Sequence, residues 1–163
     1  MMQCSDGREN PCDAYTNYAN EQDLVTLSPL KQNFQKGETL KLKFSVSSKL
    51  KVNTKSIDIF QSTKRNSGIL SIDVSELFKD NAVTFVKGNK LAENKVSAVY
   101  NSTTDRYESE IDIILNKQGT YSISSFTTFQ ERESEEGICL YIALITNIKG
   151  DNLNNGRVEF AVN

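Results

Sequence analysis

Alternation of apolar and polar residues is the main pattern along this chain. In the clearest case, Thr39–Ser47, leucine, phenylalanine and valine occupy every second position, with lysine or serine between them. A period of two places the apolar side chains on one face of a β-strand and leaves the other face in water. Weaker versions of the pattern predict further strands at residues 24–28, 57–61, 69–74, 82–86, 95–100 and 158–162. Residues 138–146 are apolar on both faces, which fits a central strand or a buried helix; the length and the bounding Gly137 and Asn147 favour the strand.

The stretch Asp105–Ser124 shows the same period twice, with a break between the two runs. Apolar residues alternate up to Leu115 and again after Gly119, while residues 116–119 are polar or glycine. We therefore expect two strands here, joined by a turn that leads from one sheet to another.

Helical patterns are nearly absent. Residues 75–81 predict a helix of one or two turns, with Ser75 as its N-cap and Leu77 and Phe78 facing the core. Residues 127–136 contain four glutamates and are interpreted as a polar loop with an acidic cluster. Asn155-Gly156 is the preferred pair for a type I' turn, which predicts a final hairpin before Val158.

These elements predict an all-β protein, an antiparallel immunoglobulin-like β-sandwich of about 7–9 strands with minimal helix. Residues 22–163 are expected to form this single domain. Residues 1–21 are polar and are interpreted as a leader or tether. At 163 residues, the chain is long enough to bury a core of its own.

Charge and composition exclude several classes of function. The chain has 19 basic and 21 acidic residues and no basic cluster, so we expect no nucleic-acid partner. Histidine is absent, which excludes Ser-His-Asp and Cys-His catalysis and imidazole metal ligands. The loop at residues 151–156 departs from the EF-hand pattern at Leu153, so neither a metal nor a cofactor is expected.

The sequence from Asn116 to Ile123 resembles the corner of immunoglobulin-type domains. In that family a glycine, then a tyrosine two residues later, then a buried residue open a strand, and the tyrosine hydroxyl bonds back to the turn. Gly119, Tyr121 and Ile123 match this order. Lys117 replaces the usual Asp, Ile123 replaces the antibody cysteine, and the chain has no tryptophan. The resemblance therefore implies a fibronectin-like or bacterial immunoglobulin-like sandwich and excludes an antibody-like one.

The first residues resemble the mature start of a bacterial lipoprotein. Cys4-Ser5-Asp6-Gly7 is followed by a polar stretch to Asn10, as in lipoproteins whose first cysteine carries the lipid. The resemblance covers about ten residues. It implies lipidation of Cys4, a lipid anchor in the membrane, and an exported protein at the bacterial cell envelope, on the outer membrane or the cell surface. No signal peptide precedes Cys4 in this sequence.

Three cysteines leave the disulfide pattern open. If Cys4 carries lipid, Cys12 and Cys139 can form a bridge that fastens the leader to the sheet. Alternatives are a bridge between Cys4 and Cys12, or a free Cys12 thiol with Cys139 as a small apolar residue in the core.

Three hypotheses for function follow, from different classes. The favoured one is a non-enzymatic envelope or surface lipoprotein that acts as a binding module or an accessory subunit of a larger complex, with a protein or surface glycan as partner. The second is a carbohydrate-binding sandwich, which requires an aromatic platform; the candidates are Tyr15, Tyr18, Tyr100, Tyr107, Phe126 and Phe129. The third is a hydrolase with paired carboxylates, although Glu110 and Asp112 are explained equally by the wet face of a strand.

Overall fold

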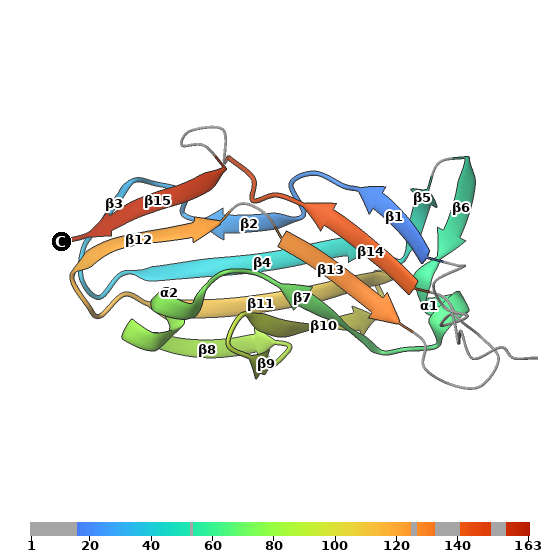
Figure 1. Ribbon diagram of the computed structural model, residues 1–163. Helices are drawn as coiled ribbons and strands as arrows, with labels where there is room; N and C mark the ends of the chain where they lie inside the picture. The colour runs from blue at the N-terminus through green and yellow to red at the C-terminus, as the bar shows by residue number, and fades with distance from the viewer. Residues whose placement is uncertain (1–15, 53, 125–126, 133–140, 151–155) are drawn as a thin grey trace, which may run out of the picture.

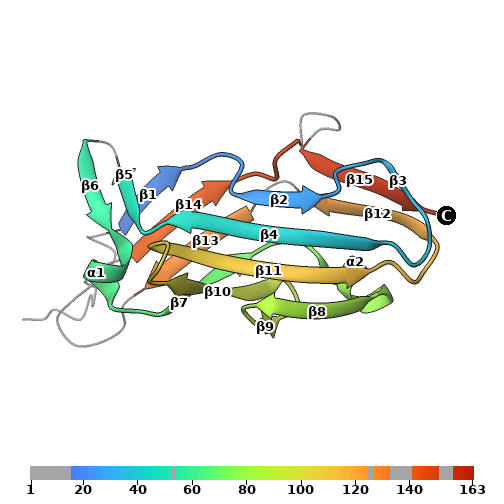
Figure 2. The ribbon, with the colours of Figure 1, turned by 180° about the vertical axis from the view of Figure 1, so that it is seen from behind.

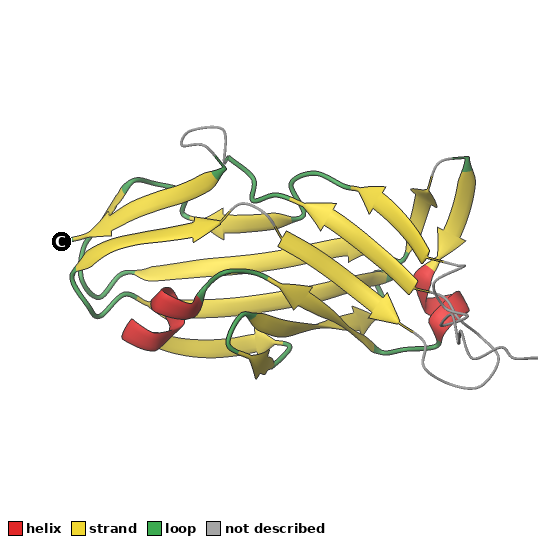
Figure 3. Ribbon diagram, viewed as in Figure 1, coloured by secondary structure: helices red, strands yellow, loops and turns green. Residues whose placement is uncertain are grey.

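The computed structural model describes residues 16–52, 54–124, 127–132, 141–150 and 156–163, and they are mostly β-structure (Figures 1 and 3). Two short helices interrupt the strands, α1 (Ile59–Thr63) and α2 (Ser75–Asp80). Neither they nor any other helix of the described residues has the length and apolar character to cross a membrane.

The strands divide between three sheets. In chain order they are β1 (Thr16–Asn20), β2 (Val25–Ser28), β3 (Asn33–Phe34), β4 (Thr39–Ser47), β5 (Lys49–Val52), β6 (Lys55–Asp58), β7 (Ser67–Ser71), β8 (Ala82–Lys87), β9 (Lys90–Ala92), β10 (Lys95–Asn101), β11 (Arg106–Ile114), β12 (Gly119–Ser124), β13 (Thr127–Arg132), β14 (Tyr141–Thr146) and β15 (Arg157–Val162).

The largest sheet has ten strands and curls around the core (Figures 1 and 2). Its path runs β1-β14-β13-β7-β10-β11-β4-β2, with β8 paired to β11 and β9 paired to β10. A three-stranded sheet, β12-β15-β3, lies beside it, and β5 and β6 form a separate hairpin.

The core lies between β4 and β13, which belong to opposite halves of the curled sheet. The rings of Phe44 on β4 and Phe129 on β13 stack at 5.2 Å between centroids. The small sheet extends this core, with Phe160 of β15 packed edge-on against Phe34 at 5.2 Å. Apolar residues from both sheets thus form a continuous interior.

Several sequence expectations are confirmed. The alternation in β4 buries every second residue from Leu40 to Val46. Strand β11 buries Ile111 and Ile113, and β12 buries Tyr121 and Ile123. The helix expected at residues 75–81 is α2, but Ser75 lies inside it and is not its cap. Val74 takes the N-cap position and makes no side-chain hydrogen bond there.

The strand count and the purely antiparallel pairing were wrong. Fifteen strands occur in the described residues, against the expected 7–9. Strands as short as β3 and β9 carry no readable period, and β1 and β13 lie in segments that were interpreted as a leader and a loop. Two pairs are parallel, β1 with β14 and β15 with β3. The mostly β composition is therefore correct, while the sheets are mixed.

The strand expected at residues 57–61 ends early and becomes helix α1. The Asp58 carboxylate accepts a hydrogen bond from the Gln61 backbone N–H at 3.0 Å, which is an N-cap geometry. Lys64 ends the helix in a left-handed conformation with φ 56°. These local hydrogen bonds override the apolar period of Ile57 and Ile59.

The loop expected at residues 127–136 was wrong for its first part. Residues 127–132 form β13, which pairs with β14 and with β7. Glu131 is 2% exposed, because it occupies the next position of the alternation that buries Thr127 and Phe129. The glutamate content suggested a solvated loop, but alternate residues of this segment are buried and it forms a strand. Residues 133–140 lie outside the described residues.

Two further expectations concern the chain ends. Strand β15 follows the Asn155-Gly156 pair as predicted, and it pairs with β12 and β3. The residues that would form the other arm of the final hairpin fall at 151–155, outside the described residues, so the hairpin stays a prediction. Strand β1 lies inside the segment 1–21 that was interpreted as a leader. The leader stays a prediction for residues 1–15, which the structure does not describe.

Candidate binding site beside helix α2

Helix α2 is fixed by hydrogen bonds to the turn that precedes β12. Its Leu77 is buried and Phe78 packs edge-on against Phe85 of β8, with 6.0 Å between ring centroids. Asn81, at the C-cap, donates to the Leu77 carbonyl at 2.9 Å and accepts from the backbone N–H of Asn116 at 2.9 Å. The Lys117 ammonium also pairs with Asp80 at 3.2 Å. The helix is therefore held at a fixed position relative to β12.

A groove of about 360 Å³ separates α2 from β12; we call it the β12 groove. Residues 73–77 and Asp80 form one wall, and residues 118–122 with Arg157 form the other. Thr120 and Ser122 are exposed because Tyr121 between them points into the core. The groove is therefore bordered by the polar face of β12 and the outer side of α2.

A second groove, of about 560 Å³, lies between α2 and β9; we call it the β9 groove. Phe78, Leu91 and Ala92 give it an apolar part, and Leu91 is 52% exposed. Lys79, Lys90 and Glu93 complete its rim, and Ser75 is shared with the β12 groove. Volumes of this size fit a small ligand or a few side chains of a partner.

Charges in the β12 groove are only partly neutralised. Asp80 is paired with Lys117, and the Arg157 guanidinium lies 3.5 Å from the Ser122 hydroxyl. Asp73 and Glu76 are exposed and take part in no ion pair within the part of the chain that the structure describes. In the same part of the chain, no group of three or more acidic or cysteine side chains could hold a metal ion.

Sequence reasoning missed both grooves, although one signal pointed to the acidic wall. Glu76 and Asp80 are four residues apart, a spacing that places side chains on one side of a helix, and Asp73 lies two residues before the helix begins. Which strand lies opposite the helix depends on the tertiary fold, so the groove itself has no sequence signal.

Of the three residues expected to form a corner between sheets, Gly119 and Tyr121 line the β12 groove. Strand β11 belongs to the large sheet and β12 to the small one, so the turn between them links the two sheets. Gly119 has φ 153°, a conformation that residues with a Cβ rarely adopt. The Tyr121 hydroxyl donates to the Lys117 carbonyl at 3.0 Å, and Ile123 is fully buried.

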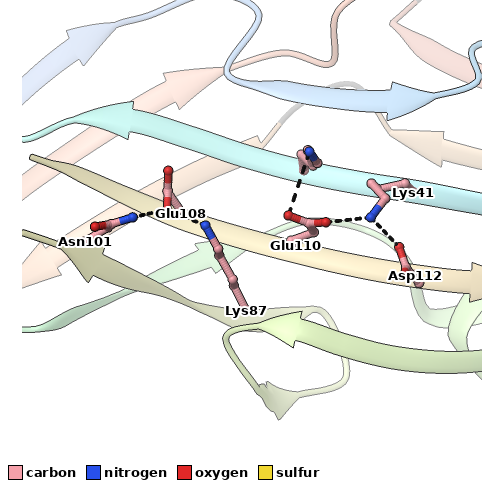
Figure 4. Close-up of polar contacts among 7 residues, drawn as sticks. Lys41, Lys87, Asn101, Glu108, Glu110 and Asp112 are labelled. Atoms are coloured by element: carbon pink, nitrogen blue, oxygen red, sulfur yellow. Dashed lines mark hydrogen bonds and ion pairs between the residues drawn. The ribbon is translucent and has the colours of Figure 1, made fainter. Parts of the chain in front are cut away.

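The wet face of β11 carries a network of ion pairs with its neighbours (Figure 4). Lys41 of β4 contacts Glu110 at 2.5 Å and Asp112 at 3.0 Å. On β8, Lys87 contacts Glu108 at 2.8 Å. Glu110 and Asp112, the carboxylates considered for hydrolysis, therefore share one ammonium group.

These contacts shift the pKa values of the paired groups. Hydrogen bonds from Lys41 to Glu110 and Asp112 raise the pKa of Lys41, and the bond from Lys41 lowers the pKa of Glu110. The Lys87 contact likewise lowers the pKa of Glu108 and raises that of Lys87. Both carboxylates are thus held ionised, which fits a structural role in the sheet.

A buried polar cluster lies at the opposite end of the core. Tyr107 is fully buried and donates its hydroxyl proton to the Arg65 carbonyl at 2.8 Å. Burial, followed by the charge of Glu131, raises the pKa of Tyr107. The Glu131 carboxylate lies 3.9 Å from the Arg65 guanidinium. Strands β11 and β13 place these groups together although they are distant in sequence.

Of the aromatic candidates for a glycan platform, four lie in the described residues, and three of these are wholly or partly covered. Tyr107 and Phe129 are fully buried. Tyr100 stacks on Phe60 at 4.0 Å and 5°, which covers one ring face. Tyr18 is 62% exposed, while Tyr15 and Phe126 lie outside the described residues.

The remaining candidate residues lie outside the part of the chain that the structure describes. They are Cys4, Cys12, Cys139, the glutamates at 133, 135 and 136, and the loop residues 151–155. Lipidation and both disulfide alternatives therefore stay predictions.

Comparison with known proteins gives little. No family model matches the sequence, and no curated protein matches it. Among solved structures, the chain is similar to a family 123 glycoside hydrolase from Clostridium perfringens, studied for glycolipid glycan hydrolysis, at 13% identity and a TM-score of 0.26. The alignment covers 80% of this chain and 22% of that enzyme. A TM-score this low carries no information about fold or activity.

Proposed function

We propose that this protein is a non-enzymatic binding module or accessory subunit of a cell-envelope complex, with the surface around α2 as its contact site. The observation that carries the proposal is the pair of grooves, which open on either side of a helix whose position is fixed by Asn81 and Lys117. Preorganised grooves bind without an added ordering cost. A protein partner suits a site of two adjacent grooves, one acidic and one partly apolar.

The charged groups elsewhere support a role without catalysis. Glu110 and Asp112 both contact Lys41, and Glu108 contacts Lys87. A general acid needs a carboxyl whose pKa is raised toward the working pH. The pKa values of Glu108 and Glu110 are instead lowered by these contacts.

The immunoglobulin-like identity of the fold is part of the proposal. It is supported by Gly119, Tyr121 and Ile123 at the turn between the two sheets, and by the hydrogen bond from Tyr121 to Lys117. An experimental structure that includes residues 133–140 and 151–155 tests it through the complete strand connectivity. A connectivity without a Greek-key arrangement contradicts this part of the proposal.

Site-specific photo-crosslinking in the native host tests the binding role. A photoreactive residue replaces Thr120 in the β12 groove or Leu91 in the β9 groove, and Thr104 in the exposed turn between β10 and β11 serves as the control. We expect one discrete protein adduct from at least one groove position and none from Thr104. Absence of adducts from both grooves, or equal labelling at all three positions, contradicts the proposal.

The envelope location is a separate part of the proposal and has its own test. It rests on the resemblance of residues 4–10 to a lipoprotein start. Mass spectrometry of the protein produced from its complete gene in its native host is expected to show a diacyl or triacyl group on Cys4. A processed chain whose Cys4 carries no lipid contradicts the proposed lipid anchor. It does not affect the proposed binding site at α2.

A further inference from the structure

Strand β12 has one open edge, and this edge borders the β12 groove. The strand has six residues and is the end strand of its sheet, because only β15 pairs with it in the described residues. In an antiparallel pair, alternate residues direct their N–H and C=O groups away from the partner strand. Figure 1 shows β12 between β15 and α2, so these groups face the side on which the groove lies.

The edges at β2, β3 and β8 differ from this one. Residue Val25 of β2 bridges to Ile148, and the Lys149 N–H donates to the Val25 carbonyl at 2.7 Å, so that edge is partly closed. Strand β3 has two residues. Strand β8 carries Lys87, and the β9 groove is lined by α2 and β9 rather than by β8.

Edge strands normally carry a feature that prevents pairing with another chain, such as a lysine, a proline or an inward charge. The sequence of β12, Gly-Thr-Tyr-Ser-Ile-Ser, has none of these. Its neighbour Lys117 is engaged by Asp80 and lies before the strand. An unprotected edge beside a groove is the arrangement used by domains that bind peptides by strand addition.

We propose that an extended, basic segment of a partner protein adds to β12 as a further strand and lies in the β12 groove. This inference rests on the proposed function and names the partner of that site. Backbone hydrogen bonds to the open edge of β12 supply affinity, and the wall formed by α2 contacts alternate side chains of the added strand.

The negative charge of the groove wall favours an added strand with basic side chains. Asp73 and Glu76 are exposed in the wall and have no ion pair in the described part of the chain, while Asp80 is occupied by Lys117. Arg157 lies on the β12 side of the groove, near Ser122. Lysine or arginine side chains on the face of the added strand that points to α2 therefore meet two carboxylates, and acidic side chains are repelled.

A peptide titration tests the inference on the complete chain. The probe is a capped, fluorescent peptide that alternates lysine with valine or threonine, and a peptide with glutamate in place of lysine is its counterpart. Two further versions carry N-methyl groups on either the odd or the even residues. N-methylation removes N–H donors, and only one set of alternate N–H groups faces β12.

We expect the basic peptide to bind, one N-methylated version to lose binding and the other to retain it. The acidic peptide is expected to bind at least tenfold more weakly. No binding at about millimolar peptide overturns the inference. So does equal loss, or equal retention, of binding in the two N-methylated versions, which indicates contact by charge alone.

Substitutions locate the peptide. Glu76→Gln is expected to weaken binding about two- to fivefold, the range for exposed ion pairs. Asp23→Asn removes the same charge from an exposed position that lines neither groove and is the matched control, with no expected change. An equal effect of both substitutions places the peptide elsewhere and contradicts the inference. If crosslinks from Thr120 or Leu91 identify a partner while the peptides fail, strand addition is wrong and the binding role stands.

Discussion

At the scale of single residues, Gly68 shows how a missing side chain shapes the core. A Cβ on Gly68 would lie 2.5 Å from Cζ of Phe129 and 2.7 Å from Oε2 of Glu131. Neither neighbour can move freely, because Phe129 stacks on Phe44 and Glu131 is buried. The close approach of β7 and β13 at this point therefore requires glycine.

The substitution Gly68→Ala tests this packing. We expect a loss of about 1–3 kcal/mol in the free energy of unfolding, the usual cost of overfilling a packed core. Urea unfolding followed by circular dichroism measures it. Ser67→Ala, at the exposed neighbouring position, is the control and should change little. A Gly68→Ala protein as stable as the native one means that β7 and β13 adjust.

Tyr121 tests the link between the two sheets. Its hydroxyl bonds to the carbonyl of Lys117, an exposed residue, so water can replace the tyrosine there. We therefore expect Tyr121→Phe to cost about 0.5–1.5 kcal/mol, as for a typical neutral hydrogen bond. Chemical denaturation measures the change. The same experiment on Tyr18→Phe, whose ring is 62% exposed, should show almost none; equal values for both substitutions exclude a specific role for Tyr121.

At the scale of elements, the ion pairs of β4, β11 and β8 stabilise the sheet over a defined pH range. The lowered pKa values of Glu108 and Glu110 mean that their stabilisation is present above the ordinary value of 4.5 and is lost as pH falls through the lowered values. The raised pKa values of Lys41 and Lys87 mean that theirs is present below 10.5 and is lost as pH rises through the raised values.

Glu110→Gln separates this network from other acid effects. The variant is expected to be modestly less stable than the native protein at pH 7, with a difference that disappears as the pH falls well below 4.5. Unfolding free energies measured from pH 7 downward test this. A difference that persists in strong acid assigns the effect to packing and contradicts the ion-pair explanation.

At the scale of the whole molecule, aromatic rings connect the surface to the core. Phe60 stacks on Tyr100, Tyr100 contacts Tyr107 at 5.3 Å, and Tyr107 contacts Phe129 at 5.4 Å between ring centroids. The chain of rings continues to Phe44 on the facing strand. Tyr107 thus joins α1, β11 and β13 through packing and through its bond to Arg65.

The buried Tyr107 makes the fold sensitive to alkali. Its pKa is raised above 10.0, so the stabilisation is present below pH 10 and is lost as pH rises above it, where the unfolded chain ionises first. Tyr107→Phe is expected to be less stable by about 0.5–1.5 kcal/mol at pH 7. This gap should narrow above pH 10. Urea unfolding between pH 7 and 11 measures the gap, and a constant gap shows that ionisation of Tyr107 is not involved.

The sequence alone predicted the elements whose pattern is local. The period of two in residues 39–47 predicted β4 and its buried face, and Leu77 predicted the core side of α2. The order of Gly119, Tyr121 and Ile123 predicted a turn that connects two sheets. These features depend on neighbours within a few residues, because backbone period and turn chemistry are local properties.

The tertiary structure alone decided which strands meet and what lies between them. Strand β15 pairs with β12 and β3, which are distant in sequence, because its apolar face is buried against Tyr121 and Phe34 in the small sheet. Glu131 is buried because Gly68 leaves room for it. The β12 groove exists because α2 and an edge strand 40 or so residues further along the chain face each other, and pairing over such distances depends on the packing of whole faces.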